Sequence, residues 1–201
     1  SLTQDRKYRA AARTFSDAFS QISGRFQKLQ SLTLADVIEL IDDAQNTLDD
    51  VWKADVDSND LLYPQFRMKH LCDIIAEAFG RFIQSDENLH EDKLWHGPFA
   101  SVSTSLRDAM EICDRWSRVV HELTSSFWST YSPHPWKDAP YRPTFTQKLW
   151  KRLETILRIR TTHEELLRLL PASEQRSLRV RENFKPFAKT RPLQCNPYTE
   201  S

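Results

Sequence analysis

The sequence predicts an all-α protein, an elongated array of antiparallel helices in one or two small bundles followed by an extended C-terminal crossover. Apolar residues recur three and four positions apart over most of the 201 residues, which is the spacing of one helix face. Glycine occurs only three times, which argues against hairpin-rich sheets and phosphate-binding loops. Eleven Phe, six Trp and five Tyr require a core, although 28% of the residues are charged.

Two apolar stripes at the start of the chain predict a helical hairpin. Thr33 separates them and reads as an N-cap, with Asp36 three residues later in a weak capping box. Each stripe needs a facing helix to cover it, so the two helices are expected to pair antiparallel. The first stripe contains Tyr8, Ala12, Phe15, Phe19, Ile22, Phe26 and Leu29. The second contains Leu34, Val37, Ile41, Ala44, Leu48 and Val51.

Two further helices are expected in the middle of the chain. The polar stretch 55–60 predicts a loop, and a third helix should run from about Pro64 to Ile83. Its stripe is Leu71, Ile75, Ala78 and Phe82, widened by Cys72, Ile74 and Phe79. A second loop is expected over 85–93, before a fourth helix that starts at Gly97-Pro98 and spans about 50 Å to Tyr131. Its seam is Phe99, Val102, Leu106, Ala109, Cys113, Trp116, Val120, Leu123 and Phe127.

Prolines separate a fifth helix from the fourth. Four of them exclude helix between the two: Pro133, Pro135, Pro140 and Pro143. The fifth helix should run over 144–170, with Leu149, Leu153, Ile156, Leu157, Leu166, Leu167 and Leu170 facing inward. Beyond about Arg179, further prolines and few apolar pairs predict an extended segment.

These elements suggest a division of the chain into three parts. Residues 1–95 would form a first bundle of three helices, and residues 96–180 a second bundle of two long helices joined by the proline-rich corner. Residues 181–201 would link to a further helix. Whether the helices form one bundle or two stays open.

Charge and cysteine content indicate a reduced protein with two oppositely charged regions. The net charge is zero, but residues 33–60 carry nine acidic residues against one basic, and residues 137–191 carry fourteen basic against six acidic. These regions either steer partners, face each other within the fold, or are simply solvated helix faces. Cys72 and Cys113 lie on apolar stripes, where a reduced cysteine acts as a small hydrophobe. No signal peptide or membrane-spanning run is expected, and the first residue, Ser1, suggests a start within a longer protein.

No residue pattern points to catalysis, a cofactor or a metal. His163-Glu164 begins like a zinc-protease motif, but position 167 is Leu, so the second histidine is missing. His90 and His96 share one loop without a matching ligand pair. The basic C-terminal third contains aromatic residues suited to single-stranded nucleic acid, yet acidic residues interrupt it and no binding motif appears. We therefore expect no enzyme activity in this segment and no nucleic-acid partner.

Four stretches of the chain resemble a known family. Residues 67–83, 131–136, 151–174 and 195–200 are similar to the first tail region of dynein heavy chains, above all to the branch that drives retrograde intraflagellar transport. The resemblance implies a parent chain that is a microtubule motor ATPase, with its motor domain outside this fragment. It implies a non-catalytic tail segment made of helical bundles, located in the cytoplasm and the cilium. A helical adaptor or tethering-complex rod unrelated to dynein is the alternative.

The resemblance also implies partners, although it carries over no binding residues. The tail of such a chain assembles with a second heavy chain, with intermediate, light-intermediate and light chains, and with the intraflagellar-transport train. The residues themselves suggest one contact candidate, the aromatic side chains of Tyr131, Trp136 and Tyr141 among the prolines, since prolines limit the entropy lost on binding. An equally plausible role for this loop is to fold onto its own bundle, with Trp136 plugging one end.

Overall fold

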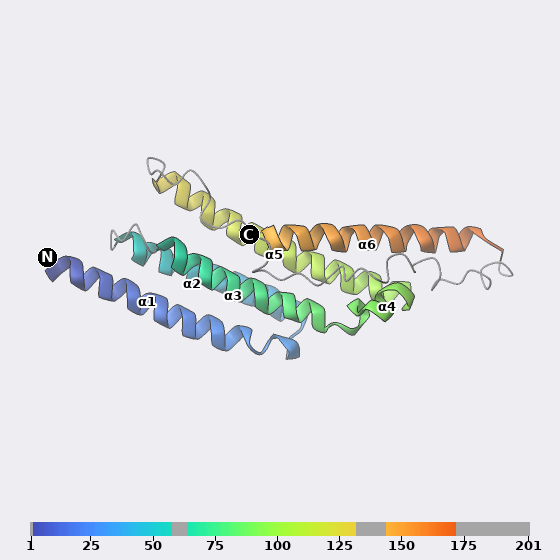
Figure 1. Cartoon of the computed structure of the whole chain (residues 1–201), viewed down its shortest axis with the longest axis horizontal. Helices are drawn as coiled ribbons and strands as arrows, with labels where there is room; N and C mark the ends of the chain where they lie inside the picture. The colour runs from blue at the N-terminus through green and yellow to red at the C-terminus, as the bar shows by residue number, and fades with distance from the viewer. Residues whose placement is uncertain (1, 58–63, 132–143, 172–201) are drawn as a thin grey trace. The chain divides into compact units, whose positions relative to one another are not determined.

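The computed structural model describes residues 2–57, 64–131 and 144–171, and within these ranges every regular element is helical (Figure 1). The all-α class is therefore confirmed. The elements in chain order are α1 (Leu2–Phe26), η1 (Leu29–Ser31), α2 (Leu34–Asp57), α3 (Pro64–Ser85), η2 (Glu87–Leu89), α4 (Glu91–His96), α5 (Phe99–Tyr131) and α6 (Thr144–Leu169), where η denotes a 3₁₀-helix. The proline-rich corner and the C-terminal crossover lie outside the described residues.

The chain divides into two compact units. Unit 1 comprises Ser1–Phe79 and Arg115–Thr144, and unit 2 comprises Gly80–Asp114 and Phe145–Ser201. Each unit is thus assembled from two separate stretches of chain, and the division falls inside α3 and inside α5. The three-part division at residues 95 and 180 stays a prediction.

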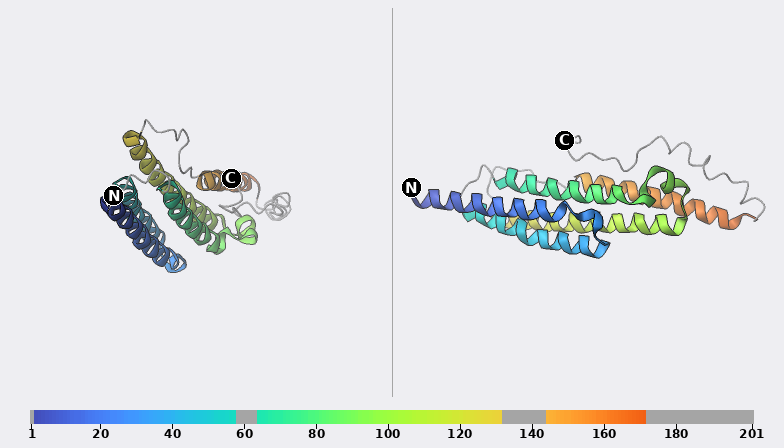
Figure 2. Two further views of the ribbon diagram at one scale, coloured as in Figure 1. Left: turned by 60° about the vertical axis from the view of Figure 1, so that its left-hand side comes forward. Right: turned by 90° about the horizontal axis from the view of Figure 1, so that it is seen from below.

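Helices α1 and α2 form the expected hairpin in unit 1 (Figure 2). The capping box at its turn is confirmed: the Thr33 backbone N–H donates to Asp36 Oδ2 at 2.9 Å, and the Asp36 N–H donates back to Thr33 Oγ1 at 3.3 Å. The Thr33 hydroxyl also donates to Asp36 Oδ2, at 2.7 Å, and this bond, followed by the one from the Thr33 N–H, lowers the pKa of the Asp36 carboxyl. The stripe of α2 is buried as expected at Val37, Ile41, Ala44, Leu48 and Val51.

The predicted stripe of α1 is wrong in its first two-thirds. Ile22, Phe26 and Leu29 are buried, but Tyr8 and Phe19 remain 40% and 39% exposed. The buried positions there are instead Ala11 and Ala18. At 100° per residue, this face is rotated by about 70° from the aromatic stripe. Small residues let two helix backbones approach closely, so the alanines face the bundle while the larger aromatic side chains stay at its edge.

Helices α3 and α5 are buried largely at the positions that the sequence predicted, and the residues of each helix are divided between unit 1 and unit 2. Phe79 of α3 packs edge-on against Trp116 of α5, with ring centroids 5.9 Å apart. In α3 the buried set includes Leu71, Cys72, Ile75, Ala78 and Phe79, while Phe82 is only half-buried and Ile83 is buried in its place. In α5 the predicted seam is buried at Val102, Leu106, Ala109, Cys113, Trp116 and Val120.

Helix α6 in unit 2 is buried along one stripe that includes a charged residue. Thr146, Leu149, Leu153, Ile156 and Arg160 are buried at alternating spacings of three and four. The predicted inward position of Leu166 is wrong, since its side chain is 56% exposed, and the neighbouring Leu169 is 82% exposed. The buried stripe of α6 ends at Arg160. In the last two turns of the helix, Leu166 and Leu169 are therefore not covered by other described residues.

The predicted loop over 85–93 is wrong, because this stretch contains η2 and the first half of α4. Leu89 of η2 and Leu94 and Trp95 of α4 are buried in unit 2. A helix of six residues completes fewer than two turns, so it shows no repeated 3/4 pattern that sequence reasoning could detect.

Candidate functional site

The contact residues predicted from sequence lie at or beyond the edge of the described residues. Tyr131 is the last residue of α5, and its side chain is not described. Trp136 and Tyr141 fall in the range 132–143, outside the described residues. Their role stays a prediction, and the structure directs attention to two other features, one in each unit.

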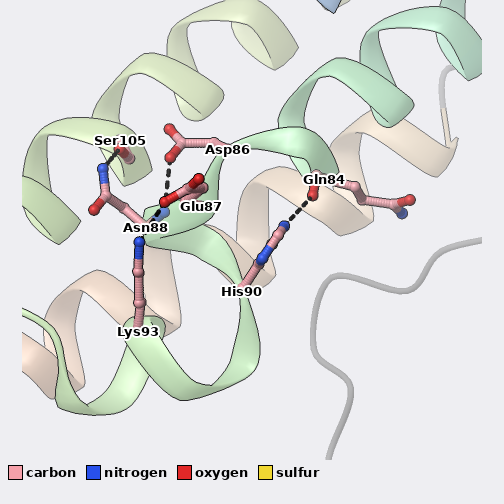
Figure 3. Close-up of polar contacts among 7 residues, drawn as sticks. All are labelled: Gln84, Asp86, Glu87, Asn88, His90, Lys93 and Ser105. Carbon is pink, nitrogen blue, oxygen red and sulfur yellow. Dashed lines mark hydrogen bonds and ion pairs between the residues drawn. The ribbon is translucent and has the colours of Figure 1, made fainter.

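The first feature is a polar corner in unit 2, where α3, η2 and α4 follow one another (Figure 3). Asp86 is the N-cap of η2, and its Oδ1 accepts a hydrogen bond from the backbone N–H of Asn88 at 2.8 Å. The Asn88 side chain donates in turn to Ser105 Oγ on α5 at 3.1 Å. His90 Nε2 lies 3.1 Å from the carbonyl oxygen of Gln84, a hydrogen bond in the tautomer that carries its proton on Nε2. Asp86 thus closes the turn itself, while Asn88 and His90 tie it to α5 and to the end of α3.

An exposed ion pair lies on the outside of this corner. Lys93 of α4 donates to Glu87 of η2 (Figure 3). The hydrogen bond from Lys93 lowers the pKa of the Glu87 carboxyl, and the lysine charge lowers it further. Because both side chains are largely exposed, water screens the pair and its contribution to stability is small.

Arg160 of α6 secures the inner side of the corner. The residue is 5% exposed, and its guanidinium donates from one terminal nitrogen to the carbonyl of Leu94 at 2.9 Å and from the other to the carbonyl of Gly97 at 2.7 Å. The carbonyls at the end of a helix lack intrahelical partners, and a cation there also interacts favourably with the helix dipole. Desolvation lowers the pKa of the Arg160 guanidinium, and the charge of Glu164 opposes that shift. The fork of Arg160 therefore caps the end of α4 from another helix.

Gly97 makes room for this arrangement. Its backbone N–H donates to the carbonyl of Lys93 at 2.7 Å, which closes the last turn of α4. A Cβ atom at this position would lie 2.5 Å from that same backbone oxygen and 3.3 Å from a methyl of Val102. Its backbone conformation, φ −69° and ψ 165°, suits any residue. Glycine is thus required here by space.

A repulsive cluster of carboxylates lies in the same unit. Desolvation raises the pKa of the Asp108 carboxyl on α5, and the charges of Glu111 and Asp86 raise it further. A carboxyl with a raised pKa holds its proton more tightly in the folded chain than in the unfolded chain, so stability is lost as pH rises through the ordinary Asp pKa and the raised one.

Replacement of Asp108 by Asn is expected to stabilise the chain at pH 7 by up to about 1 kcal/mol, since the side chain is half-buried and water screens its neighbours. At pH 3 the gain should vanish, because Asp108 is then protonated and neutral in the wild type as well. Thermal unfolding at both pH values measures the effect, and Glu111→Gln should give a smaller gain in the same direction. A variant that is no more stable than wild type at pH 7, or that gains more at pH 3, would contradict the electrostatic cause.

The histidines and cysteines of the described residues are candidate metal ligands or nucleophiles. No group of three or more His, Cys, Asp or Glu within them is arranged to hold a metal ion. His163 lies on α6, where desolvation and then the charge of Arg160 lower the pKa of its imidazole. Cys72 and Cys113 are both buried, and burial raises the pKa of the Cys72 thiol. None of the described helices has the length and apolarity needed to cross a bilayer.

Three carboxylates of the acidic helix α2 form ion pairs with other helices of unit 1. Asp43 forms an ion pair with Arg25 of α1 at 2.8 Å, and Asp42 forms one with Arg115 of α5 at 2.5 Å. The 1%-exposed Asp55 pairs with Arg67 of α3 at 2.6 Å. Basic residues from three neighbouring helices thus neutralise part of the acidic region internally, which favours a structural role over partner steering for these carboxylates.

The second feature is an aromatic surface in unit 1, made of Tyr8, Phe15 and Phe19 of α1 and His70 of α3, which we call the α1–α3 surface. The rings of Phe19 and His70 are stacked, with centroids 5.7 Å apart and an interplanar angle of 7°. Phe15 lies 6.4 Å from Phe19, and the Arg67 guanidinium lies 5.9 Å from the Phe15 centroid. Sequence reasoning missed this surface, although the basic residues around Tyr8 were a signal that this part of α1 is exposed.

The sequence is similar to dynein heavy chains over nearly its whole length. It is 43% identical over 186 residues, 92% of its length, to cytoplasmic dynein 2 heavy chain 1 of Mus musculus. The identity to the protein of the same name is 42% over 94% of the chain for Homo sapiens, and 41% over 98% for Tripneustes gratilla. The chain spans 4% of the length of each of these relatives. No protein-family model matches it.

Proposed function

Because the chain belongs to the dynein heavy-chain family, as a homologue of one segment of cytoplasmic dynein 2 heavy chain 1, we propose that it is a non-catalytic scaffold segment of a heavy-chain tail. In this role it contributes to heavy-chain assembly and to the docking of associated chains or of the intraflagellar-transport train. The parent chain is then a microtubule motor ATPase whose motor domain lies outside this segment, and it works in the cytoplasm and the cilium. The observation that carries the proposal is that nearly the whole chain matches one short segment, 4% of the length, of each of these much longer relatives.

The geometry supports a mechanical role. In unit 2 a buried arginine and several polar side chains brace the end of α4, and in unit 1 ion pairs from three helices brace α2. Such contacts hold helices at defined angles, which a segment that positions other polypeptides needs. The proposed partners are a second heavy chain and the intermediate, light-intermediate and light chains, with no nucleic acid and no insertion into the membrane.

The test is a direct binding experiment with the 201-residue chain. It is mixed with purified dynein 2 intermediate and light-intermediate chains, and the mass of each species is measured by light scattering during size-exclusion chromatography. A complex with at least one of these chains is expected, together with no binding of ATP. Turnover or binding of ATP would refute the scaffold role, and a monomer that binds neither chain would refute the docking role.

The same assay tests the predicted contact residues. If Trp136 and Tyr141 touch a partner, replacing both by alanine should raise the dissociation constant of the complex at least about tenfold. That change corresponds to a loss of about 1.4 kcal/mol of binding free energy, as expected for aromatic anchors. Tyr198→Ala is the matched control, because Tyr198 is also an aromatic residue beside a proline. An equal effect of the control, or none from the double variant, would remove these residues from the interface. The alternative, a helical adaptor unrelated to dynein, predicts no complex in either case.

A further inference from the structure

We propose that the exposed face of α6 in unit 2 binds a partner helix that carries carboxylates at one end and apolar side chains at the other. This inference rests on the proposed docking role and specifies the chemistry of one docking partner. Its starting point is a row of exposed side chains on α6, which we call the α6 stripe. The row consists of Lys148, Lys151, Arg158, Leu166 and Leu169.

All five side chains lie on the same side of the helix. At 100° per residue they fall within an arc of about 80°, on the side of α6 opposite the buried residues between Leu149 and Arg160. The nearest acidic positions around the helix, Glu154 and Glu165, lie about 60–80° from the middle of this arc. The basic and the apolar residues therefore belong to one surface, from which acidic residues are absent.

The stripe changes in character along its length. Its three basic residues lie between positions 148 and 158, and its two leucines lie at the C-terminal end of the helix. Leu166 is 56% exposed and Leu169 is 82% exposed, so a partner that covers them gains from the burial of apolar surface. Lys151 and Arg158 form no ion pair with other described residues, so both cations are available to a partner's carboxylates.

The shape and the charge of the stripe together select an acidic helix as the occupant. The stripe is a straight row about 32 Å long, which matches about six turns of a second helix packed alongside α6. Such a helix presents side chains at positions i, i+3, i+4 and i+7. Carboxylates at one end of its face would pair with Lys151 and Arg158 and steer the approach. Apolar side chains at the other end would cover Leu166 and Leu169.

Two other occupants complement the stripe less well. A second copy of α6 would place lysines against lysines if the two helices were parallel, and leucines against lysines if they were antiparallel. Like charges at an interface cost free energy, and so does a lysine that is desolvated against a leucine. The rest of this chain, residues 172–201, contains six basic residues against three acidic ones, so its charge repels the basic half of the stripe.

The proposal is tested with a synthetic probe. The probe is a fluorescent helical peptide of about 25 residues, whose binding face has glutamates in one half and leucines in the other. One control peptide carries lysines in place of the glutamates. The second control has the composition of the probe, with its glutamates and leucines on opposite faces of the helix. Anisotropy is measured with the 201-residue chain at low and at physiological salt. Saturable binding of the probe is expected, at least about tenfold tighter than binding of either control and weakened by salt.

Substitutions in the chain locate the binding site. Leu166→Ser with Leu169→Ser should raise the dissociation constant of the probe at least about tenfold, because it removes both apolar anchors. Lys151→Gln with Arg158→Gln should raise the dissociation constant less and should reduce its dependence on salt. Circular dichroism and thermal unfolding verify that each variant folds.

The matched control variants lie on α1 in unit 1. Tyr8→Ser with Phe19→Ser removes two exposed apolar side chains, and Arg6→Gln with Arg13→Gln removes two exposed basic ones. Both pairs of substitutions should leave binding of the probe unchanged, since neither touches α6.

Four outcomes would overturn the proposal. The first is equal binding of all three peptides, and the second is unchanged binding by the Leu166 and Leu169 variant. The third is no saturable binding of the probe, as expected if residues 172–201 cover the stripe. The fourth is a concentration-dependent dimer of the wild type that the leucine variant abolishes.

The docking role is judged separately from these results. None of the four outcomes affects the complex with the dynein 2 intermediate or light-intermediate chains. Conversely, a chain that binds the probe but neither dynein 2 subunit would retain the α6 stripe as a binding surface and lose the docking role.

Discussion

Replacement of Arg160 by alanine is expected to lower the free energy of unfolding by about 3 kcal/mol. The variant leaves the carbonyls of Leu94 and Gly97 without the two charge-assisted hydrogen bonds that the buried guanidinium provides. It also removes a long side chain from the buried stripe of α6, so packing is lost together with charge. Chemical denaturation measures the change, and amide hydrogen exchange should show that the end of α4 opens more often.

Two variants separate the fork geometry of Arg160 from its charge and size. Arg160→Lys retains the charge but has a single ammonium group, so it should recover only part of the loss. Arg158→Ala removes an exposed arginine from the same helix and should change stability by less than about 0.5 kcal/mol. If Arg160→Ala were as mild as Arg158→Ala, the corner around α4 would not depend on Arg160.

The second large effect is expected at the ion pair between Asp55 and Arg67. Arg67→Met should destabilise the chain by about 3 kcal/mol, because it removes the cation 2.6 Å from a carboxylate that is 1% exposed. Chemical denaturation at pH 7 measures the effect.

The matched control for Arg67→Met lies on the same helix. Lys69 forms an i,i+4 pair with Asp73 at 2.8 Å, but its side chain is about half exposed, so Lys69→Met should cost at most about 1 kcal/mol. Adding Asp55→Leu to Arg67→Met should restore part of the stability, because the buried charge then disappears. Equal losses from Arg67→Met and Lys69→Met would contradict the importance of burial.

Local patterns predicted the helices because their causes are local. The seam of α5 and the stripe of α2 follow from apolar residues at a period near 3.6, and Thr33 and Asp36 start α2 through bonds between neighbours. Local reasoning failed for α4, whose six residues are held largely by Arg160 and by the burial of Trp95. It also failed for the first two-thirds of α1, where Ala11 and Ala18 are buried in place of the aromatic residues.

The candidate sites were less predictable than the helices. The sequence drew attention to aromatic residues between prolines, namely Tyr131, Trp136 and Tyr141, whereas the described α1–α3 surface arises because Phe19 and His70 meet across 51 positions of sequence. Which apolar stripe remains exposed depends on how many neighbours a helix has, and periodicity does not encode that number.

The sequence by itself determined the all-α class, the course of the long helices and the kinship with dynein 2 heavy chains, because each is written in local spacing or in residue identity. Tertiary structure alone decided which face of α1 is buried, that Arg160 enters the core of unit 2, and that the carboxylates of α2 pair with three neighbouring helices. The physical reason is that burial and ion pairing each depend on two surfaces in contact. The sequence of a single helix specifies only one of those two surfaces.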